Sequence, residues 1–300
     1  MTDILIIGSG PAGISAALYA ARAGMETVVV SSGQSALFKA HLIENYYGME
    51  KPVSGRELYL NGIAQAQALG VDIIDEQVVG LGFDGSFIVT TEKGRYSSKA
   101  VIIATGSSRN TPPVPGLKEF EGRGVSYCAV CDGFFHRGKN VAVIGAGSYA
   151  LHEALELAPI VQSVTVLTDG KEPEFILPDG KTSDPGSPNE YAENISINTA
   201  GIKELKGEEL LGSVVFDDGS TIEVSGVFVA AGTAGSSDLA RKLGALTEGN
   251  KIAVNGQMAT NIPGLYAAGD CTPGMLQIAK AVYQGAEAAT SAIRFVRESK

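Results

Sequence analysis

The feature that most constrains the fold is a pattern that occurs twice: an apolar run, a glycine-rich turn and a helix-like stretch. In the first copy, Ile4 to Ile7 lead into Gly8-Ser-Gly-Pro-Ala-Gly13 and then into alanine-rich residues up to Ala23. In the second copy, Val141 to Ile144 lead into Gly145-Ala-Gly-Ser-Tyr-Ala150. Glycines at this spacing let the backbone turn tightly and approach a dinucleotide pyrophosphate at the helix N-terminus. Each copy therefore predicts a Rossmann-like unit.

The order of further apolar runs indicates that one unit is inserted into the other. Each unit continues in a second predicted strand and closes with a strand that ends in a glycine turn, and the C-terminal segment supplies another such strand and a helix. These elements are residues 27–30, 100–106, 163–167, 227–232, 265–270 and 277–296. A chain of 300 residues is long enough for two domains. We predict an α/β fold with two Rossmann-like, three-layer nucleotide-binding domains. The first is discontinuous, residues 1–112 and 237–300, and the second, residues 113–236, is inserted into it.

The charge and the hydropathy pattern exclude several classes of partner. The net charge of −10 argues against nucleic acid or an anionic membrane surface as the principal partner. No apolar run approaches the 18 or so residues of a membrane span, and Met-Thr-Asp at the N-terminus leads directly into a predicted strand. We therefore expect a cytoplasmic protein with no membrane partner.

The cysteines point to redox chemistry. The chain has three, and two of them form the motif Cys128-Ala-Val-Cys131. A zinc site is the competing interpretation, but no second cysteine or histidine pair supplies the remaining ligands, so we expect no metal. Two cysteines at this spacing can close a disulfide, and a neighbouring acid, Asp132, can carry the accompanying proton.

Several motifs together resemble the low-molecular-weight thioredoxin reductases. They are the first glycine-rich turn, Glu44-Asn-Tyr-Tyr-Gly48, Ala104-Thr-Gly106, Gly122 to Phe135 with the embedded Cys-Ala-Val-Cys-Asp, and Ala268-Gly-Asp270. The resemblance spans nearly the whole chain. It implies an FAD-dependent homodimer that reduces thioredoxin through a Cys128/Cys131 disulfide, with Cys131 facing the flavin and Cys128 attacking the partner disulfide.

The same resemblance implies a set of site residues. Cys128, Cys131 and Asp132 are the expected catalytic residues. The expected FAD-binding residues are Gly8, Ser9, Gly10, Pro11, Ala12, Gly13, Ser31, Asn45, Ala104, Thr105, Gly106, Gly269, Asp270, Gln277 and Ile278. Ser31 stands where the acid that binds the adenosine ribose usually ends the second strand.

The second nucleotide site departs from the family pattern. NADPH-using members carry an arginine cluster for the 2′-phosphate, whereas this chain has Thr168-Asp-Gly-Lys-Glu172. Asp169 repels a phosphate, although it could accept a hydrogen bond from an NADH ribose. Tyr149 places a bulky ring in the turn, and Leu276 replaces the usual arginine near the flavin. These departures argue against NADPH and resemble the pyridine-nucleotide-independent, ferredoxin-linked branch of the family.

Several alternatives stay open at this point. The electron donor could be ferredoxin, NADH or a deazaflavin, and the protein could instead be a dithiol oxidase that uses oxygen or a flavin redox sensor. Cys-Ala-Val-Cys-Asp argues against a ferredoxin–NADP reductase. Ferredoxins are acidic, so a ferredoxin partner requires a local basic patch, for which the candidates are Arg22, Lys39, Lys51 and Arg56.

The two half-reactions predict movement between the domains. A dithiol close enough to accept electrons from the flavin is too buried to meet a protein disulfide. The two chain crossings, Thr111 to Gly116 and Gly232 to Ser237, are rich in Pro, Gly or Ser. We predict that they act as paired hinges; the alternative is local opening of the loop that carries the cysteines.

Overall fold

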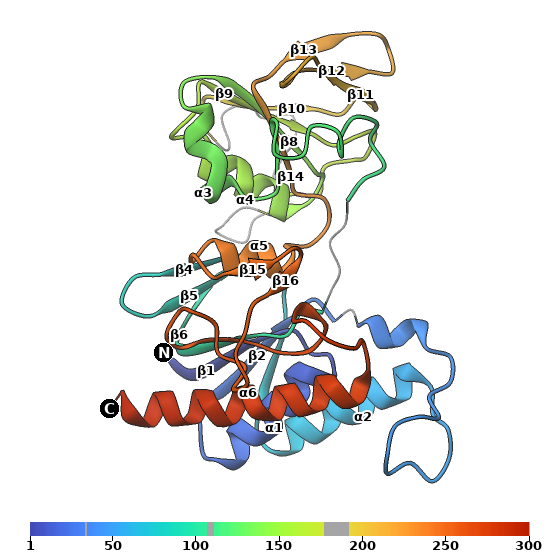
Figure 1. The fold of residues 1–300 in the computed structure, drawn as a ribbon, viewed down its shortest axis with the longest axis vertical. Helices are drawn as coiled ribbons and strands as arrows, with labels where there is room; N and C mark the ends of the chain where they lie inside the picture. The colour runs from blue at the N-terminus through green and yellow to red at the C-terminus, as the bar shows by residue number, and fades with distance from the viewer. Residues whose placement is uncertain (34, 107–110, 177–191, 300) are drawn as a thin grey trace. The chain divides into compact units, whose positions relative to one another are not determined.

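The chain divides into two compact units in the computed structural model, which describes residues 1–33, 35–106, 111–176 and 192–299 (Figure 1). Unit 1 comprises Met1–Thr91, Arg95–Ser108 and Gly235–Lys300, and unit 2 comprises Glu92–Gly94 and Arg109–Ala234. Among the described residues, no helix combines the length and the apolar character needed to cross a membrane.

Unit 1 is built on a seven-stranded sheet. Its order is β3-β2-β1-β6-β5-β4, and β17 also pairs with β6. The strands are β1 (Thr2–Ile7), β2 (Thr27–Ser31), β3 (Asp72–Asp75), β4 (Val78–Phe83), β5 (Phe87–Thr91), β6 (Arg95–Ile103) and β17 (Leu265–Ala267). The pairs among β1, β2, β3, β6 and β17 are parallel, whereas β4, β5 and β6 form an antiparallel meander. Strand β1 is apolar and buried from Ile4 to Ile7, as expected for a central parallel strand covered on both faces.

Three helices of unit 1 lie together beside this sheet (Figure 1). They are α1 (Pro11–Arg22), α2 (Gly55–Ala68) and α6 (Ile278–Glu298), and α1 packs along α6 and against α2. Helix α1 begins with a proline, which has no backbone N–H and so leaves no unpaired donor at the first position of the helix. The remaining elements are η1 (Ala36–Lys39), α5 (Ser236–Arg241), β15 (Thr247–Glu248), β16 (Lys251–Ile252) and η3 (Gly269–Cys271).

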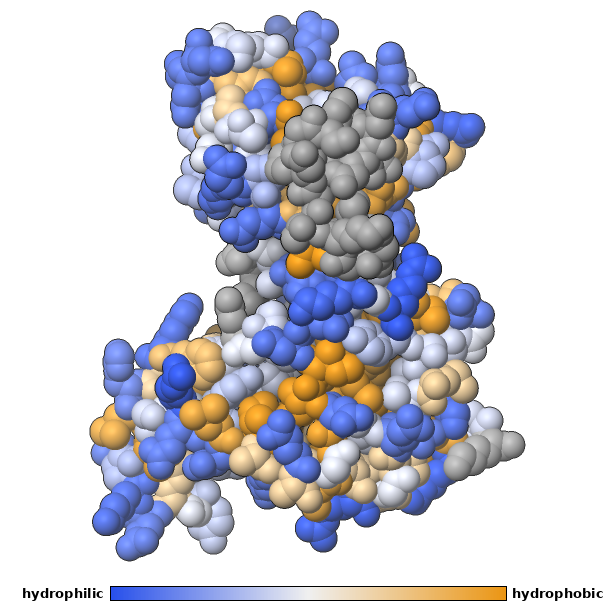
Figure 2. All heavy atoms as spheres, turned by 180° about the vertical axis from the view of Figure 1, so that it is seen from behind, coloured by the Kyte–Doolittle hydropathy of each residue, from blue (hydrophilic) through white to orange (hydrophobic). Residues whose placement is uncertain are grey.

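Seen from behind, hydrophilic residues cover much of both units, and unit 1 also presents an apolar area (Figure 2).

Unit 2 contains a second parallel sheet, in the order β10-β9-β8-β14-β7. These strands are β7 (Val125–Ser126), β8 (Asn140–Ile144), β9 (Ser163–Leu167), β10 (Ile195–Asn198) and β14 (Gly226–Val229). An antiparallel sheet of β11 (Ile202–Gly207), β12 (Leu211–Phe216) and β13 (Thr221–Glu223) packs into the same core. The helices are α3 (Ala129–Asp132), η2 (Gly133–His136) and α4 (Ser148–Leu157).

The predicted fold class is confirmed: both units are α/β, with a parallel sheet and a strand–turn–helix start. The predicted strand over 163–167 coincides with β9, and the predicted C-terminal helix over 277–296 corresponds to α6. The two antiparallel parts were not among the predicted elements. They enlarge each unit without altering the end of the sheet at which the glycine-rich turns lie.

Candidate active site

The first glycine-rich turn forms a cradle at the N-terminus of α1. Gly8 has φ +107°, and a Cβ there would lie 2.5 Å from the carbonyl oxygen of Ala104. A Cβ on Gly13 would lie 1.8 Å from the carbonyl oxygen of Gly8, so both positions require glycine. Gly10 is the N-cap of α1, has no side-chain cap and faces open space, its nearest neighbour being Ser35 Oγ at 3.9 Å. The uncapped helix end therefore offers its N–H groups to an anion.

Hydroxyl groups replace the acid expected at the end of β2. Ser9 is buried, and its Oγ donates to Ser31 Oγ at 2.8 Å. The same Ser9 oxygen is 2.8 Å from the hydroxyl of Tyr59 on α2. The structure thus brings two expected FAD-binding residues together, and it adds Tyr59, which the sequence motifs did not indicate.

The opposite side of the cradle is formed by the end of β6 and the Gly269-Asp270 turn. A Cβ on Gly269, which has φ +83°, would lie 2.8 Å from Ala12 Cβ, so this turn packs directly on the start of α1. Asn45 Nδ2 donates to Gln277 Oε1 at 3.1 Å, although these residues are 232 positions apart in the chain. Gln277 is the N-cap of α6, which also has no side-chain cap.

Two buried polar atoms at this edge have no hydrogen-bond partner among the described residues, Thr105 Oγ1 and Asp270 Oδ1. A buried polar atom without a partner is unfavourable unless a ligand completes its hydrogen bonds. Together with the open N-terminus of α1, these atoms fit a dinucleotide with hydroxyl and phosphate groups. The residues present are therefore suited to FAD, with Asp270 and Thr105 toward its polar chain and Gly8 to Gly13 at its pyrophosphate.

Two buried residues of α6 support the Gly269-Asp270 turn and were missed by the sequence analysis. Gln284 Oε1 accepts the Gly269 N–H at 2.9 Å, and Lys280 Nζ donates to the carbonyl oxygens of Gly269 and Thr272, each at 3.1 Å. Burial lowers the pKa of the Lys280 ammonium. A lysine and a glutamine on the buried face of a predicted helix were the signal that could have identified them.

The redox pair lies in unit 2 as a disulfide between Cys128 and Cys131, with a Cα–Cα distance of 5.3 Å. Cys128 is the N-cap of α3, is 3% exposed, and its Sγ accepts the N–H of Cys131 at 3.2 Å. Cys131 is exposed. Cys131 is therefore the more accessible cysteine, whereas the resemblance gave the attack on the partner disulfide to Cys128.

Two carboxyl groups flank the disulfide. Asp132 Oδ2 accepts from Ser126 Oγ at 2.6 Å, and the same Ser126 oxygen accepts the Cys128 N–H at 3.1 Å. Asp132 is thus connected to the backbone of Cys128 through one hydroxyl group. The second carboxyl, Glu153 on α4, accepts the N–H of Ala129 at 2.9 Å and is 1% exposed. The sequence analysis named Asp132 and missed Glu153.

A later segment of the backbone is hydrogen-bonded to the second glycine-rich turn. The N–H of Glu174 donates to the carbonyl of Ala146 at 2.7 Å, and the N–H of Ile176 donates to Ser148 Oγ at 3.1 Å. Glu174 forms a parallel bridge with Gly147. Tyr149, which was expected to obstruct the turn, is 2% exposed, so its ring is packed inside the protein.

Asp169 at this site has a structural contact. Its Oδ1 accepts the N–H of Ile202 at 2.8 Å, and the residue has φ +55°. One of the two oxygens that could bind an NADH ribose is therefore already engaged in holding the start of β11. No cluster of His, Cys, Asp or Glu suited to a metal ion occurs within residues 1–33, 35–106, 111–176 and 192–299.

A family model described as pyridine nucleotide-disulphide oxidoreductase matches residues 2–285. The thioredoxin reductase of Peptoclostridium acidaminophilum is 34% identical over 98% of this chain and 96% of its own length. The chain belongs to the thioredoxin reductase family. It is accordingly a flavin-dependent disulfide oxidoreductase with a Cys128–Cys131 pair, and its cofactor is FAD, as the resemblance implied.

Solved structures of this family are similar over the whole reductase. The atypical thioredoxin reductase TRi from Desulfovibrio vulgaris Hildenborough is 41% identical, with a TM-score of 0.90 and 99% coverage of both chains. A ferredoxin-flavin thioredoxin reductase from Clostridium acetobutylicum is 30% identical, with a TM-score of 0.67, and covers 99% of this chain and 98% of its own. The reductase is thus similar both to a structure described as an atypical thioredoxin reductase and to one described as a ferredoxin-flavin thioredoxin reductase.

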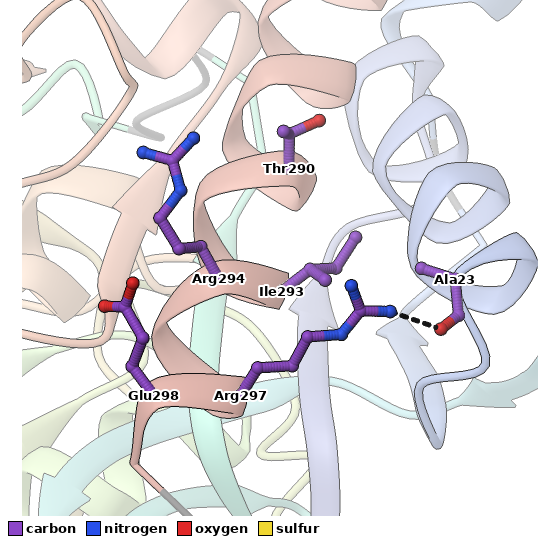
Figure 3. A pocket seen from close by; sticks show the side chains of 6 residues that line it. All are labelled: Ala23, Thr290, Ile293, Arg294, Arg297 and Glu298. Carbon is purple, nitrogen blue, oxygen red and sulfur yellow. Dashed lines mark hydrogen bonds between the residues drawn. The ribbon is translucent and has the colours of Figure 1, made fainter.

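A separate pocket of about 500 Å³ lies at the other end of α1 and α6 (Figure 3). It is lined by Ala23, Thr290, Ile293, Arg294, Arg297 and Glu298, and Arg297 donates to the carbonyl of Ala23 at 3.0 Å. The expected FAD-binding residues near these helices lie at their N-termini, so this pocket contains none of the expected site residues of the reductase.

Proposed function

We propose that the reductase takes electrons from a reduced ferredoxin, and from neither NADPH nor NADH, and passes them through FAD and Cys128/Cys131 to a thioredoxin. The observation that carries this proposal is the second glycine-rich turn. It lacks the arginine cluster, and Asp169, at the first arginine position, would repel a 2′-phosphate. Each charge-assisted hydrogen bond to a phosphate contributes about 1.5–3 kcal/mol, so losing several weakens NADPH binding by orders of magnitude.

The surroundings of that turn also disfavour NADH. One Asp169 oxygen is held by the Ile202 N–H, and the backbone of Glu174 runs beside Gly147. A residue with a negative side chain is thereby placed next to the position that a pyrophosphate would occupy. We propose that unit 2 no longer binds a nucleotide and instead serves to carry the redox pair.

Unit 1 offers a small basic area for an acidic ferredoxin. Lys39 ends η1, and the guanidinium of Arg56 on α2 lies over the Phe38 ring at 5.7 Å from its centroid. Helix α2 and η1 pack together, so two of the four predicted basic residues come from adjoining elements. Arg22 precedes Ala23 at the separate pocket and belongs to a different part of unit 1. We propose that Lys39 and Arg56 contribute to ferredoxin docking.

We also propose that Cys131 forms the mixed disulfide with thioredoxin. Cys131 is an exposed residue while Cys128 is 3% exposed, and a nucleophile must reach the partner disulfide. Cys128 would then resolve the mixed disulfide from within the protein, and Asp132, which Ser126 links to the Cys128 N–H, would be the neighbouring acid that takes up or supplies the thiol proton. The homodimer and the cytoplasmic location expected from the sequence stay predictions.

A reconstituted assay tests this function. The holoenzyme, oxidised thioredoxin and one donor at a time are incubated without oxygen, and thioredoxin thiols are counted over time. We expect thiols with reduced ferredoxin only. Thiol formation with NADH alone would establish the NADH-dependent alternative, and rapid oxygen consumption with no thioredoxin reduction would establish a dithiol oxidase.

The same assay with single-cysteine variants tests the order of attack. Cys128→Ser leaves Cys131 without a resolving thiol, and we expect it to accumulate a covalent adduct with thioredoxin on a non-reducing gel. Cys131→Ser is the matched variant and should form little adduct. An adduct that forms only in Cys131→Ser would return the attacking role to Cys128.

A further inference from the structure

Glu153 is a buried carboxyl group that the mechanism above does not use. It lies on the face of α4 that also carries Tyr149, Ala150, Ala154 and Leu157, all of them buried. Acidic residues are almost never fully buried unless they are partnered. Its Oε2 accepts the N–H of Ala129, the residue between Cys128 and Val130, at 2.9 Å.

The loop that carries the two cysteines is held tightly on this helix. Helix α3 packs against α4, and a Cβ on Gly133 would lie only 2.9 Å from Leu157 Cδ2. The backbone of Ala129 therefore has little freedom to move away from Glu153. The carboxyl group is hydrogen-bonded to the residue that directly follows Cys128.

Reduction places charge on these sulfurs. Two electrons break the S–S bond, and uptake of one proton leaves one thiol and one thiolate. The thiolate is favoured on Cys128 by the Cys131 N–H, which points at that sulfur, and on Cys131 by exposure to water. In its ionised form, the Glu153 carboxyl group would oppose a second negative charge on Cys128, which is 3% exposed.

Other titratable groups surround the pair. Burial, reinforced by Lys139, lowers the pKa of His136, so this imidazole is neutral near pH 7. Asp132 directs one oxygen to Ser126. Helix α3 itself carries Asp132, and the titratable residues on η2 and α4, which pack against it, are His136, Tyr149, His152, Glu153 and Glu156. Glu153 accepts the Ala129 N–H, whereas Glu156 pairs with His152 at 3.7 Å.

We propose that Glu153 is a positioning residue that keeps Cys128 protonated after reduction and so leaves the thiolate on the accessible Cys131. The carboxyl group acts through the Ala129 backbone and through its charge, without contact with the partner protein. The inference rests on the proposed redox role of the pair. By this proposal, a residue of α4 determines which of the two cysteines is the attacking thiolate.

The test compares Glu153→Gln with Glu156→Gln. The glutamine retains an oxygen for the Ala129 N–H and removes the charge, and Glu156 is an exposed acid on the same helix. Cysteine labelled with ¹³C at Cβ reports each thiol in the reduced holoenzyme as pH is varied. We expect the pKa of Cys128 to fall by about one unit or more in Glu153→Gln, the size of shift typical of one nearby charge. Glu156→Gln should leave both titrations unchanged.

An unchanged Cys128 titration in folded Glu153→Gln would overturn the proposal and leave Glu153 a packing residue. If that variant does not fold, infrared spectroscopy of the unaltered protein with ¹³C-labelled glutamate answers the same question. Reduction should then shift a glutamate carboxyl band that does not shift in Cys128→Ser, and no such band would equally overturn the proposal. Neither readout uses thioredoxin or an electron donor, so the proposed function can fail or hold separately.

Discussion

Cys271 is chemically separate from the redox pair. It is fully buried, its Sγ donates to the carbonyl oxygens of Ile103 and Ala268, and burial raises its pKa to about 12. We predict that iodoacetamide at pH 8 labels no cysteine in the native, oxidised enzyme and one after denaturation, measured by mass spectrometry. Because the thiol pKa rises on folding, this group favours the folded state less as pH rises from about 9 to about 12. Labelling of native Cys271 at pH 8 would contradict the burial described here.

The residues that the sequence could predict are those with a backbone requirement or a motif. Gly8 and Gly13 follow from the spacing of the glycine-rich turn, because only glycine fits those positions. Glu153 and Lys280 could not be predicted in the same way. Each is a charged residue on the apolar face of a helix, and its role depends on a backbone partner contributed by another element, Ala129 and Gly269 respectively.

At the scale of an element, the start of α1 separates two effects of glycine. We predict that Gly13→Ala destabilises the protein by about 1–3 kcal/mol, because its methyl group would overlap the Gly8 carbonyl. Gly10→Ala has room in the protein and should stay within about 1 kcal/mol of the parent. Its methyl group would, however, enter the space in which we expect the FAD pyrophosphate to bind. We expect it to weaken FAD binding about tenfold or more, which corresponds to about 1.4 kcal/mol.

Thermal unfolding of the FAD-free protein measures its stability, and titration with FAD measures its affinity for the cofactor, so the two quantities are obtained independently. Equal loss of stability in both variants would contradict the cradle geometry, as would unchanged FAD affinity in Gly10→Ala.

The elements differ in how well the sequence predicted them. The central parallel strand β8 is a continuous apolar run from Val141 to Ile144 next to a glycine-rich turn, so its position follows from the pattern. The positions of the antiparallel strands β11 to β13 did not follow from the sequence pattern. Strand β12 does not alternate strictly between buried and exposed residues, and its partners are fixed by register with β11 and β13, which no local pattern encodes.

At the scale of the whole molecule, we predict that unit 2 rotates relative to unit 1 during turnover. Spin labels on Gln65→Cys in α2 and Glu208→Cys after β11 report the distance between the units, since both positions are exposed. The buried Cys271 and the disulfide should not take up label. Pulsed electron paramagnetic resonance should give different distributions of the distance between the two spin labels for the oxidised enzyme and for the Cys128→Ser adduct with thioredoxin. One narrow distance common to both states would favour local loop opening instead.

The central claim is that electrons reach the flavin from ferredoxin and leave through the Cys128–Cys131 pair. The most direct measurement mixes oxidised holoenzyme, without oxygen, with reduced ferredoxin, NADPH or NADH, follows the visible flavin absorbance, and then adds oxidised thioredoxin. We predict that ferredoxin bleaches the flavin, that neither nucleotide does so at physiological concentration, and that thioredoxin restores the absorbance. Rapid bleaching by NADPH or NADH, or a flavin reduced by ferredoxin that thioredoxin cannot reoxidise, would contradict the account.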